Sequence, residues 1–206
     1  MRRSSGRGAL ALAATLFLAS CGSSTSTPSK DGGTKGDVAA AKADGAAAKK
    51  VEDYVPAPGA AWEEDTAAGK AGVEAAYTDV DIEKIIDGEN APYAAEGTVG
   101  FAKQDYKKDG HKLLLKLWQM KTAAGAKKMF DANKKDAETN AGLIFEPVAQ
   151  VADTAVIAYD QPQWKVFGHK GPFIYEVFAS LGNVAQKDAL KTSVLEFVQA
   201  LAKALP

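Results

Sequence analysis

Cysteine and histidine are scarce in this sequence of 206 residues, which has one cysteine, Cys21, and two histidines, His111 and His169. A lone cysteine excludes an internal disulfide, and two histidines without metal-ligand spacing give no zinc signature. Motifs of nucleophile elbows, phosphate-binding loops and zinc proteases are also missing. The sequence therefore predicts no cofactor and no catalytic residue. We interpret both histidines as exposed residues at hairpin turns, with a metal or catalytic role as the alternative.

Charge of one sign is not in excess either, with 25 Lys and Arg against 26 Asp and Glu and a formal net charge of −1. The three arginines of the sequence are Arg2, Arg3 and Arg7, and removing these three positive charges from −1 leaves −4 for the rest of the chain. This balance predicts no basic face and no nucleic-acid partner. A long apolar run is also lacking, because the run from Ala9 to Ala19 is too short to span a bilayer as a helix.

The cationic start and the short apolar run together are typical of a secretory signal. The segment Leu18-Ala19-Ser20-Cys21 follows and resembles the lipobox of bacterial lipoproteins. The resemblance implies a signal peptide over residues 1–20 and a diacylglycerol on the Cys21 thiol, which becomes the mature N-terminus. A secreted protein with a free cysteine is the alternative.

A lipid on Cys21 predicts the membrane as a partner and the bacterial cell envelope as the location. Two or three acyl chains give stable anchoring where one chain is marginal. By analogy with enteric bacteria, Gly22 in place of an aspartate after the lipid site favours the outer membrane over the inner membrane.

Large apolar residues are rare from residue 21 to residue 67, where small residues, lysine and aspartate predominate. Such a composition does not bury enough surface to offset its ordering entropy, so we interpret residues 21–67 as a flexible tether. Trp62 is the large residue within it. It either docks on the folded domain or is an exposed anchor for a protein partner.

Residues 74–206 are of the right length for one folded domain. Helical spacing of apolar residues predicts helices over 80–86, 122–135 and 186–204, with Asp79 or Asp81 capping the first and Thr122 the second. A short helical turn is expected over 93–96. Strands are expected over 98–107, 111–120, 144–149, 154–159, 163–169 and 173–180. Hairpins with few crossovers predict an α+β fold, a single antiparallel sheet with helices packed against it.

Two of these features are specific. Asp109-Gly110 between two strand patterns is a strong hairpin signal. The strand after it has Leu113, Leu115 and Leu117 on one face and Leu114, Trp118 and Met120 on the other, with Lys116 among them. Both faces are partly apolar, which predicts a central strand covered at least in part on both sides.

The segment Ile86-Asp87-Gly88 with Tyr93 a few residues on, followed by a hairpin and by Trp118-Gln119-Met120, resembles a secreted bacterial family of unknown function. Members of that family have a small or acidic residue and a hydrophobic residue before the tyrosine, whereas Pro92 stands there in this sequence. The resemblance supports the fold boundaries and implies no activity.

Candidate binding residues fall into two groups. Asp87, Glu89 and Asn90 surround Gly88 and are interpreted as a turn and helix cap, with a cation site as the alternative. Trp62 and Trp164 are candidate contacts for a protein partner. The domain is rich in aromatic residues, for which core packing is the first interpretation and a ligand groove between the sheet and a helix is the second.

The sequence thus indicates a lipid-anchored envelope protein whose domain is most simply a non-enzymatic binding module for an envelope protein or ligand. The alternatives are a periplasmic enzyme or accessory subunit, and a carrier of lipid or another apolar ligand.

Overall fold

A computed structural model of the protein describes residues 49–58, 61–68, 72–86, 90–151 and 153–206. The strands are β1 (Glu63–Glu64), β2 (Glu74–Ala76), β3 (Thr98–Lys108), β4 (His111–Met120), β5 (Glu146–Pro147), β6 (Thr154–Asp160), β7 (Gln163–Lys170) and β8 (Phe173–Ser180). The α-helices are α1 (Asp79–Ile86), α2 (Ala91–Ala95), α3 (Ala123–Asn140) and α4 (Lys187–Ala204). Short 3-10 helices are η1 (Val51–Tyr54), η2 (Thr66–Ala68) and η3 (Val184–Gln186).

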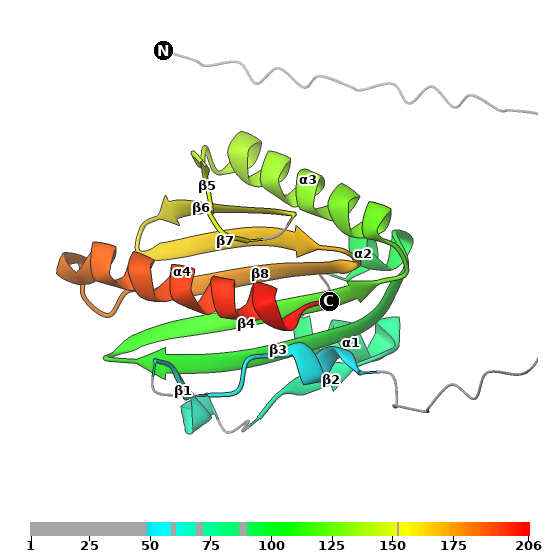
Figure 1. The fold of residues 1–206 in the computed structure, drawn as a ribbon, viewed down its shortest axis with the longest axis horizontal. Helices are drawn as coiled ribbons and strands as arrows, with labels where there is room; N and C mark the ends of the chain where they lie inside the picture. Colours follow the sequence, from blue (N-terminus) through cyan, green and yellow to red (C-terminus); the bar gives the residue numbers. More distant parts are fainter. Residues whose placement is uncertain (1–48, 59–60, 69–71, 87–89, 152) are drawn as a thin grey trace, which may run out of the picture. The chain divides into compact units, whose positions relative to one another are not determined.

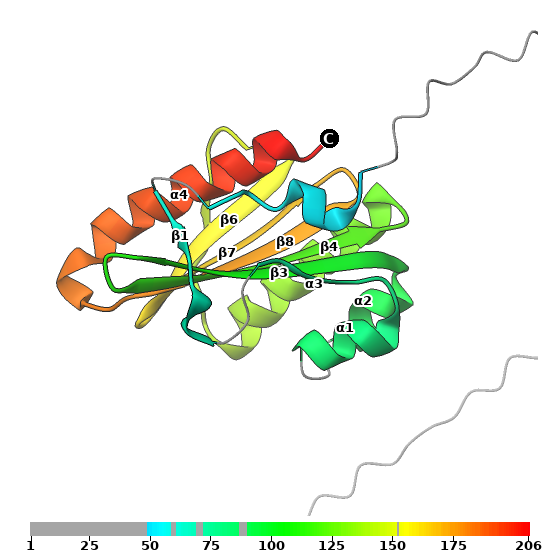
Figure 2. The ribbon, with the colours of Figure 1, turned by 90° about the horizontal axis from the view of Figure 1, so that it is seen from below.

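All of these strands belong to one sheet, in the order β1-β3-β4-β8-β7-β6-β5, with β2 also paired to β3. Every pairing between them is antiparallel. Helix α4 covers one face of the sheet, and α1, α2 and α3 lie on the other (Figures 1 and 2). The predicted α+β fold, a single antiparallel sheet with helices packed against it, is confirmed.

The β3–β4 hairpin forms at the predicted dipeptide. Asp109 has φ 50° and Gly110 has φ 80°, so both lie in the left-handed region that a two-residue hairpin turn requires. Strand β4 then separates its side chains as expected. Leu113, Leu115 and Leu117 join the core beneath α4, whereas Trp118 and Met120 join the core beneath α3.

Helix α4 buries the stripe that its sequence predicts. The buried residues of this stripe are Leu190, Val194, Phe197, Val198, Leu201 and Leu205. They recur at intervals of three and four, so they occupy one side of the helix and pack on the sheet. The Phe197 ring and the Tyr106 ring from β3 pack in a T-shaped arrangement, with centroids 5.0 Å apart.

Helix α3 begins as predicted, because the Thr122 hydroxyl accepts a hydrogen bond from the Gly125 backbone nitrogen at 3.0 Å. Two details differ from the prediction. The helix continues to Asn140 beyond the predicted end at residue 135, and Gly125 in its first turn is buried. A Cβ on Gly125 would lie 2.9 Å from the Glu96 carbonyl oxygen, so the absence of a side chain lets α3 approach the end of α2.

The start of α1 was assigned to the wrong capping residue. The Thr78 hydroxyl, and neither predicted aspartate, accepts from the Asp81 backbone nitrogen at 3.2 Å. The turn after α1 is the short helix α2, in which Pro92 occupies the first turn. Proline is tolerated there because the first backbone N–H groups of a helix have no partner inside the helix.

The folded part begins earlier than the predicted end of the tether at residue 67. Val51 is fully buried, Trp62 is 4% exposed, and the Tyr106 hydroxyl donates to the Pro56 carbonyl oxygen at 2.6 Å. Strand β1 adds to the edge of β3. The composition of this segment predicted a flexible tether because the residues that it packs against are far away in the sequence.

Two further expectations are corrected. The strand expected over 144–149 shortens to β5, and Ile144 is 87% exposed. His111 and His169 are buried, at 5% and 8% exposure, although exposed positions were expected. His111 accepts from the Gly182 backbone nitrogen through Nδ1 at 3.1 Å, which satisfies that nitrogen.

Candidate functional site

A groove of about 770 Å³ lies between α3 and the face of the sheet that α3 covers. We name it the α3 groove. Its lining residues are Pro92, Tyr93, Lys116, Met129, Ala132, Asn133, Asp136, Ala137, Ala141, Lys165, Phe167, Glu176 and Phe178. The volume falls within the roughly 300–1,000 Å³ of small-molecule sites.

A buried carboxylate is the central feature of the groove. Glu176 is 7% exposed, and its Oε1 accepts from the Tyr93 hydroxyl at 2.6 Å and from Asn133 Nδ2 at 2.7 Å. Asn133 Nδ2 also donates to the Tyr93 hydroxyl oxygen at 2.6 Å. The three side chains come from β8, α2 and α3, so one network ties two helices to the middle of the sheet.

The position of Glu176 follows from strand alternation in β8. Tyr175 and Val177 point into the core beneath α4, so Ile174, Glu176 and Phe178 point to the other face. A charge buried there without hydrogen bonds would be costly. Tyr93 and Asn133 provide those bonds.

Tyr93 is itself held in place by Trp118. The Tyr93 and Trp118 rings stack, with centroids 4.2 Å apart and an angle of 4° between their planes. The Phe101 ring packs against Trp118 in a tilted arrangement, with centroids 4.9 Å apart. Trp118 Nε1 is buried with no hydrogen-bond partner among the described residues. The indole therefore acts as an apolar support that fixes the direction of the Tyr93 hydroxyl.

Lysines and aromatic rings complete the sheet side of the groove. Lys116 stands opposite Glu176 in the β4–β8 register, and its Nζ lies 5.6 Å from the centre of the Phe178 ring. Lys165 Nζ pairs with Asp160 Oδ2 at 2.6 Å. The Phe167 and Phe178 rings meet edge to face at 6.4 Å. The site thus combines paired charges with aromatic surface.

Trp62 and Trp164 are core residues away from the α3 groove. Trp62 Nε1 donates to the Ser193 carbonyl oxygen at 3.4 Å, and Trp164 Nε1 donates to that of Lys187 at 3.0 Å. Each side chain is 4% exposed. Of the two alternatives for Trp62, the structure shows docking on the domain. Neither indole offers the exposed surface that a protein anchor needs.

Asn90 is fully buried, and its Nδ2 donates to Asp79 Oδ1 at 3.2 Å, which links α1 to the start of α2. Asp87 and Glu89, the other members of the predicted cluster, lie outside the described residues, as does Cys21. Within the described part of the chain, no group of His, Cys, Asp and Glu is arranged to hold a metal ion.

Glu176, Asn133 and Lys116 were not predicted as site residues from the sequence. One signal was available, because Glu176 is the single charged residue in the apolar strand from Phe173 to Ser180. A charge at the centre of a buried strand indicates a partner on a packed element. The sequence did not predict which residue that partner is, because Tyr93 is 83 residues away from Glu176.

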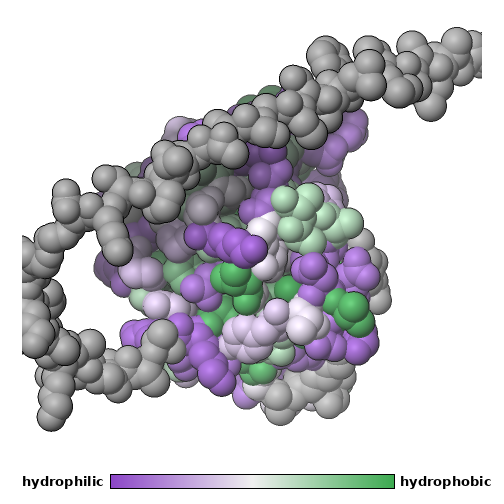
Figure 3. Space-filling model, turned by 90° about the vertical axis from the view of Figure 1, so that its right-hand side faces the viewer, coloured by the Kyte–Doolittle hydropathy of each residue, from purple (hydrophilic) through white to green (hydrophobic). Residues whose placement is uncertain are grey.

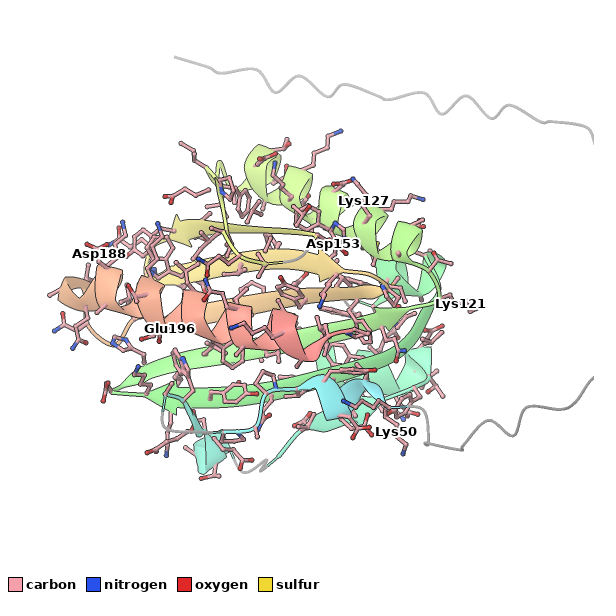
Figure 4. The ribbon with its side chains drawn as sticks, viewed as in Figure 1. Lys50, Lys121, Lys127, Asp153, Asp188 and Glu196 are labelled. Atoms are coloured by element: carbon pink, nitrogen blue, oxygen red, sulfur yellow. The ribbon has the colours of Figure 1, made fainter. Side chains whose placement is uncertain are left out.

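Other hollows of the surface are smaller than the α3 groove. A hollow of about 360 Å³ lies beside the β3–β4 hairpin, and another of about 360 Å³ lies between Pro56 and α4. The exposed apolar side chains Val73, Tyr77, Val80 and Val99 lie in or beside β2, α1 and β3. On the face drawn in Figure 3, hydrophobic residues are interspersed with hydrophilic ones. Figure 4 shows Lys127 on α3, where its Nζ pairs with Asp131 Oδ2 at 2.6 Å.

None of the helices in the described ranges has the length and apolar character of a membrane span. No protein-family description and no curated protein matches this sequence. Among solved structures, the extracellular domain of PknH from Mycobacterium tuberculosis is similar over 61% of this chain and 77% of its own, with 13% identity and a TM-score of 0.36. A similarity at this level supports no statement about function.

Proposed function

We propose that this protein is a lipid-anchored, non-enzymatic binding module of the bacterial cell envelope and that it holds its ligand in the α3 groove. The observation that carries the proposal is the buried Glu176 carboxylate at the groove, bonded to Tyr93 and to Asn133. The proposed lipid anchor rests on the resemblance of Leu18-Ala19-Ser20-Cys21 to a lipobox.

The reason lies in the cost of burying charge. Replacing a buried ionic network with apolar residues of similar volume is often neutral or stabilising, so stability alone does not account for Glu176. A binding site does account for it, because polar groups held in fixed directions beside an open groove give a ligand its orientation.

The composition of the groove bears on the two alternatives. A carrier of lipid needs an apolar cavity, whereas Lys116, Asn133 and Glu176 line this one. An enzyme acting by acid–base chemistry needs a carboxyl group that is available for proton transfer. The Glu176 Oε1 atom already accepts two hydrogen bonds at 2.6 and 2.7 Å.

The anchor is tested by intact mass of the membrane fraction, with the natural chain beside Cys21→Ser. We expect the natural chain to carry a diacylglycerol and to partition with membranes, and Cys21→Ser to do neither. An unmodified, membrane-free natural chain would overturn the anchor.

The binding site is tested by a photo-crosslinking amino acid at Ala132, an exposed residue of α3 that lines the groove. Ala124 is the matched control, because it is an exposed alanine of the same helix outside the groove. We expect crosslinks to envelope material from position 132 and not from position 124. Equal crosslinking from both positions, or none from either, would contradict the site.

A further inference from the structure

The charges at the α3 groove bear on the kind of ligand it accepts. Its lining has two lysines, Lys116 and Lys165, and two acids, Asp136 and Glu176. Lys165 is paired with Asp160, and Glu176 accepts from Tyr93 and Asn133. An ionic ligand would have to compete with these partners while gaining no net attraction. The groove is therefore suited to a neutral ligand.

Hydrogen-bonding capacity narrows the class further. Ammonium groups donate and carboxylates accept, and both kinds of group line the same groove. The two amide hydrogens of Asn133 are used by Tyr93 and Glu176, so its carbonyl oxygen is the atom of this amide that can accept a further bond. A hydroxyl group both donates and accepts, so a ligand rich in hydroxyls matches such a mixed set.

The apolar part of the lining suits the same class. Phe178 is half-buried beside Phe167. On the facing side, the small side chains of Ala132 and Ala137 in α3 and of Ala141 directly after it line the groove. A sugar ring has faces of C–H groups that pack on aromatic rings and an edge of hydroxyls. A purely apolar ligand would instead desolvate the lysines and acids without replacing their hydrogen bonds, which is unfavourable.

We infer that the α3 groove binds a neutral saccharide, with the ring on Phe178 and the hydroxyls directed to Lys116, Asn133 and Asp136. This inference rests on the proposed binding function and adds the ligand class to it. Charged glycans, lipids and peptides are the competing ligands.

The test is isothermal titration calorimetry on the full chain carrying Cys21→Ser. The probes are N,N′-diacetylchitobiose, which is neutral, and its deacetylated form, which has the same skeleton with two amines. We expect the neutral disaccharide to bind with a Kd below about 1 mM and the cationic form to bind at least about tenfold more weakly. Equal binding of the two, or no binding of the neutral one, would overturn the inference.

Two matched variants locate the binding. Ala132→Trp places an indole in the groove and should abolish binding of the neutral disaccharide. Ala124→Trp makes the same change on the same helix outside the groove and should leave the Kd unchanged. An unchanged Kd for the disaccharide in Ala132→Trp would overturn the assignment of the binding site to the α3 groove.

The crosslinking at Ala132 separates failure of the ligand class from failure of the function. Capture of envelope material from position 132 without disaccharide binding would overturn the saccharide and support the binding module. Absence of both would overturn both.

Discussion

The Tyr93 ring lies flat on the indole of Trp118, with centroids 4.2 Å apart, while its hydroxyl donates to Glu176 at 2.6 Å. Packing and hydrogen bonding therefore act on opposite ends of one side chain. The stack fixes the ring, and the fixed ring presents its hydroxyl to the carboxylate. Because α2 contributes Tyr93 and β4 contributes Trp118, the geometry of the α3 groove depends on the docking of α2 against the sheet.

Tyr93→Phe keeps the stack and removes only the hydroxyl. We expect a loss of about 1–3 kcal/mol in the free energy of unfolding, because buried Glu176 and Asn133 each lose a hydrogen bond. Urea denaturation measures this loss. Tyr77→Phe is the matched control, since the Tyr77 hydroxyl also donates to a glutamate, Glu52, but at an exposed position. A change of less than about 0.5 kcal/mol is expected there, and equal losses for the two variants would contradict a special role for the buried network.

The fold was predictable where local chemistry decides the structure. Asp109-Gly110 has the turn preference of a hairpin, and the α4 stripe has helical spacing, so both were read correctly from neighbouring residues alone. Strands β1 and β2 have two and three residues and no periodic pattern of their own. They exist because the edge of β3 offers backbone partners, which local sequence does not show.

The site was predictable only as a possibility of a groove between the sheet and a helix. The candidates Trp62 and Trp164 were chosen because large aromatic residues are typical of contact surfaces, but the same property makes them good core residues. Glu176, Tyr93 and Asn133 come together through tertiary packing of three elements. No spacing rule links residues separated by 40 to 83 positions.

The segment before residue 68 should contribute strongly to stability, although its composition resembles a linker. A chain that begins at Ala46 should unfold at the same urea concentration as the full chain, and one that begins at Ala68 should be far less stable. The second loses Val51, Trp62 and β1 together. Trp62→Ala in the full chain should cost about 3–5 kcal/mol. A stable chain beginning at Ala68 would contradict the docking of this segment.

Stability should also depend on pH through His169. Burial lowers the pKa of His169 below its usual 6.5, with Lys127 lowering it further and Asp153 and Asp131 opposing the shift. Well above pH 6.5 the residue is neutral in both states and makes no contribution. As the pH falls below 6.5 the unfolded chain takes up the proton first, so the free energy of unfolding decreases, by at most about 1.4 kcal/mol per pH unit. The decrease levels off below the folded pKa.

Urea denaturation at several pH values between 7.5 and 4.5 measures this dependence. His169→Gln removes the titrating group, so its stability should be less sensitive to pH in this range than that of the natural chain. The same pH dependence in both proteins would assign the effect to other residues.

Asn133→Asp is expected to show that the network at the α3 groove depends on its donors. The substitution replaces the amide that donates to Glu176 with a second carboxylate of nearly the same shape. At pH 7 two carboxylates would then face each other in a buried site, and we expect a loss of about 3 kcal/mol. Since each carboxylate raises the pKa of the other, the folded state binds protons more readily than the unfolded state, so stability should recover as the pH is lowered.

Asn140→Asp is the matched control, because Asn140 is exposed on the same helix. Urea denaturation at pH 7 and pH 5 distinguishes the two variants, and a loss at position 133 that did not recover in acid would indicate a packing defect in place of charge repulsion.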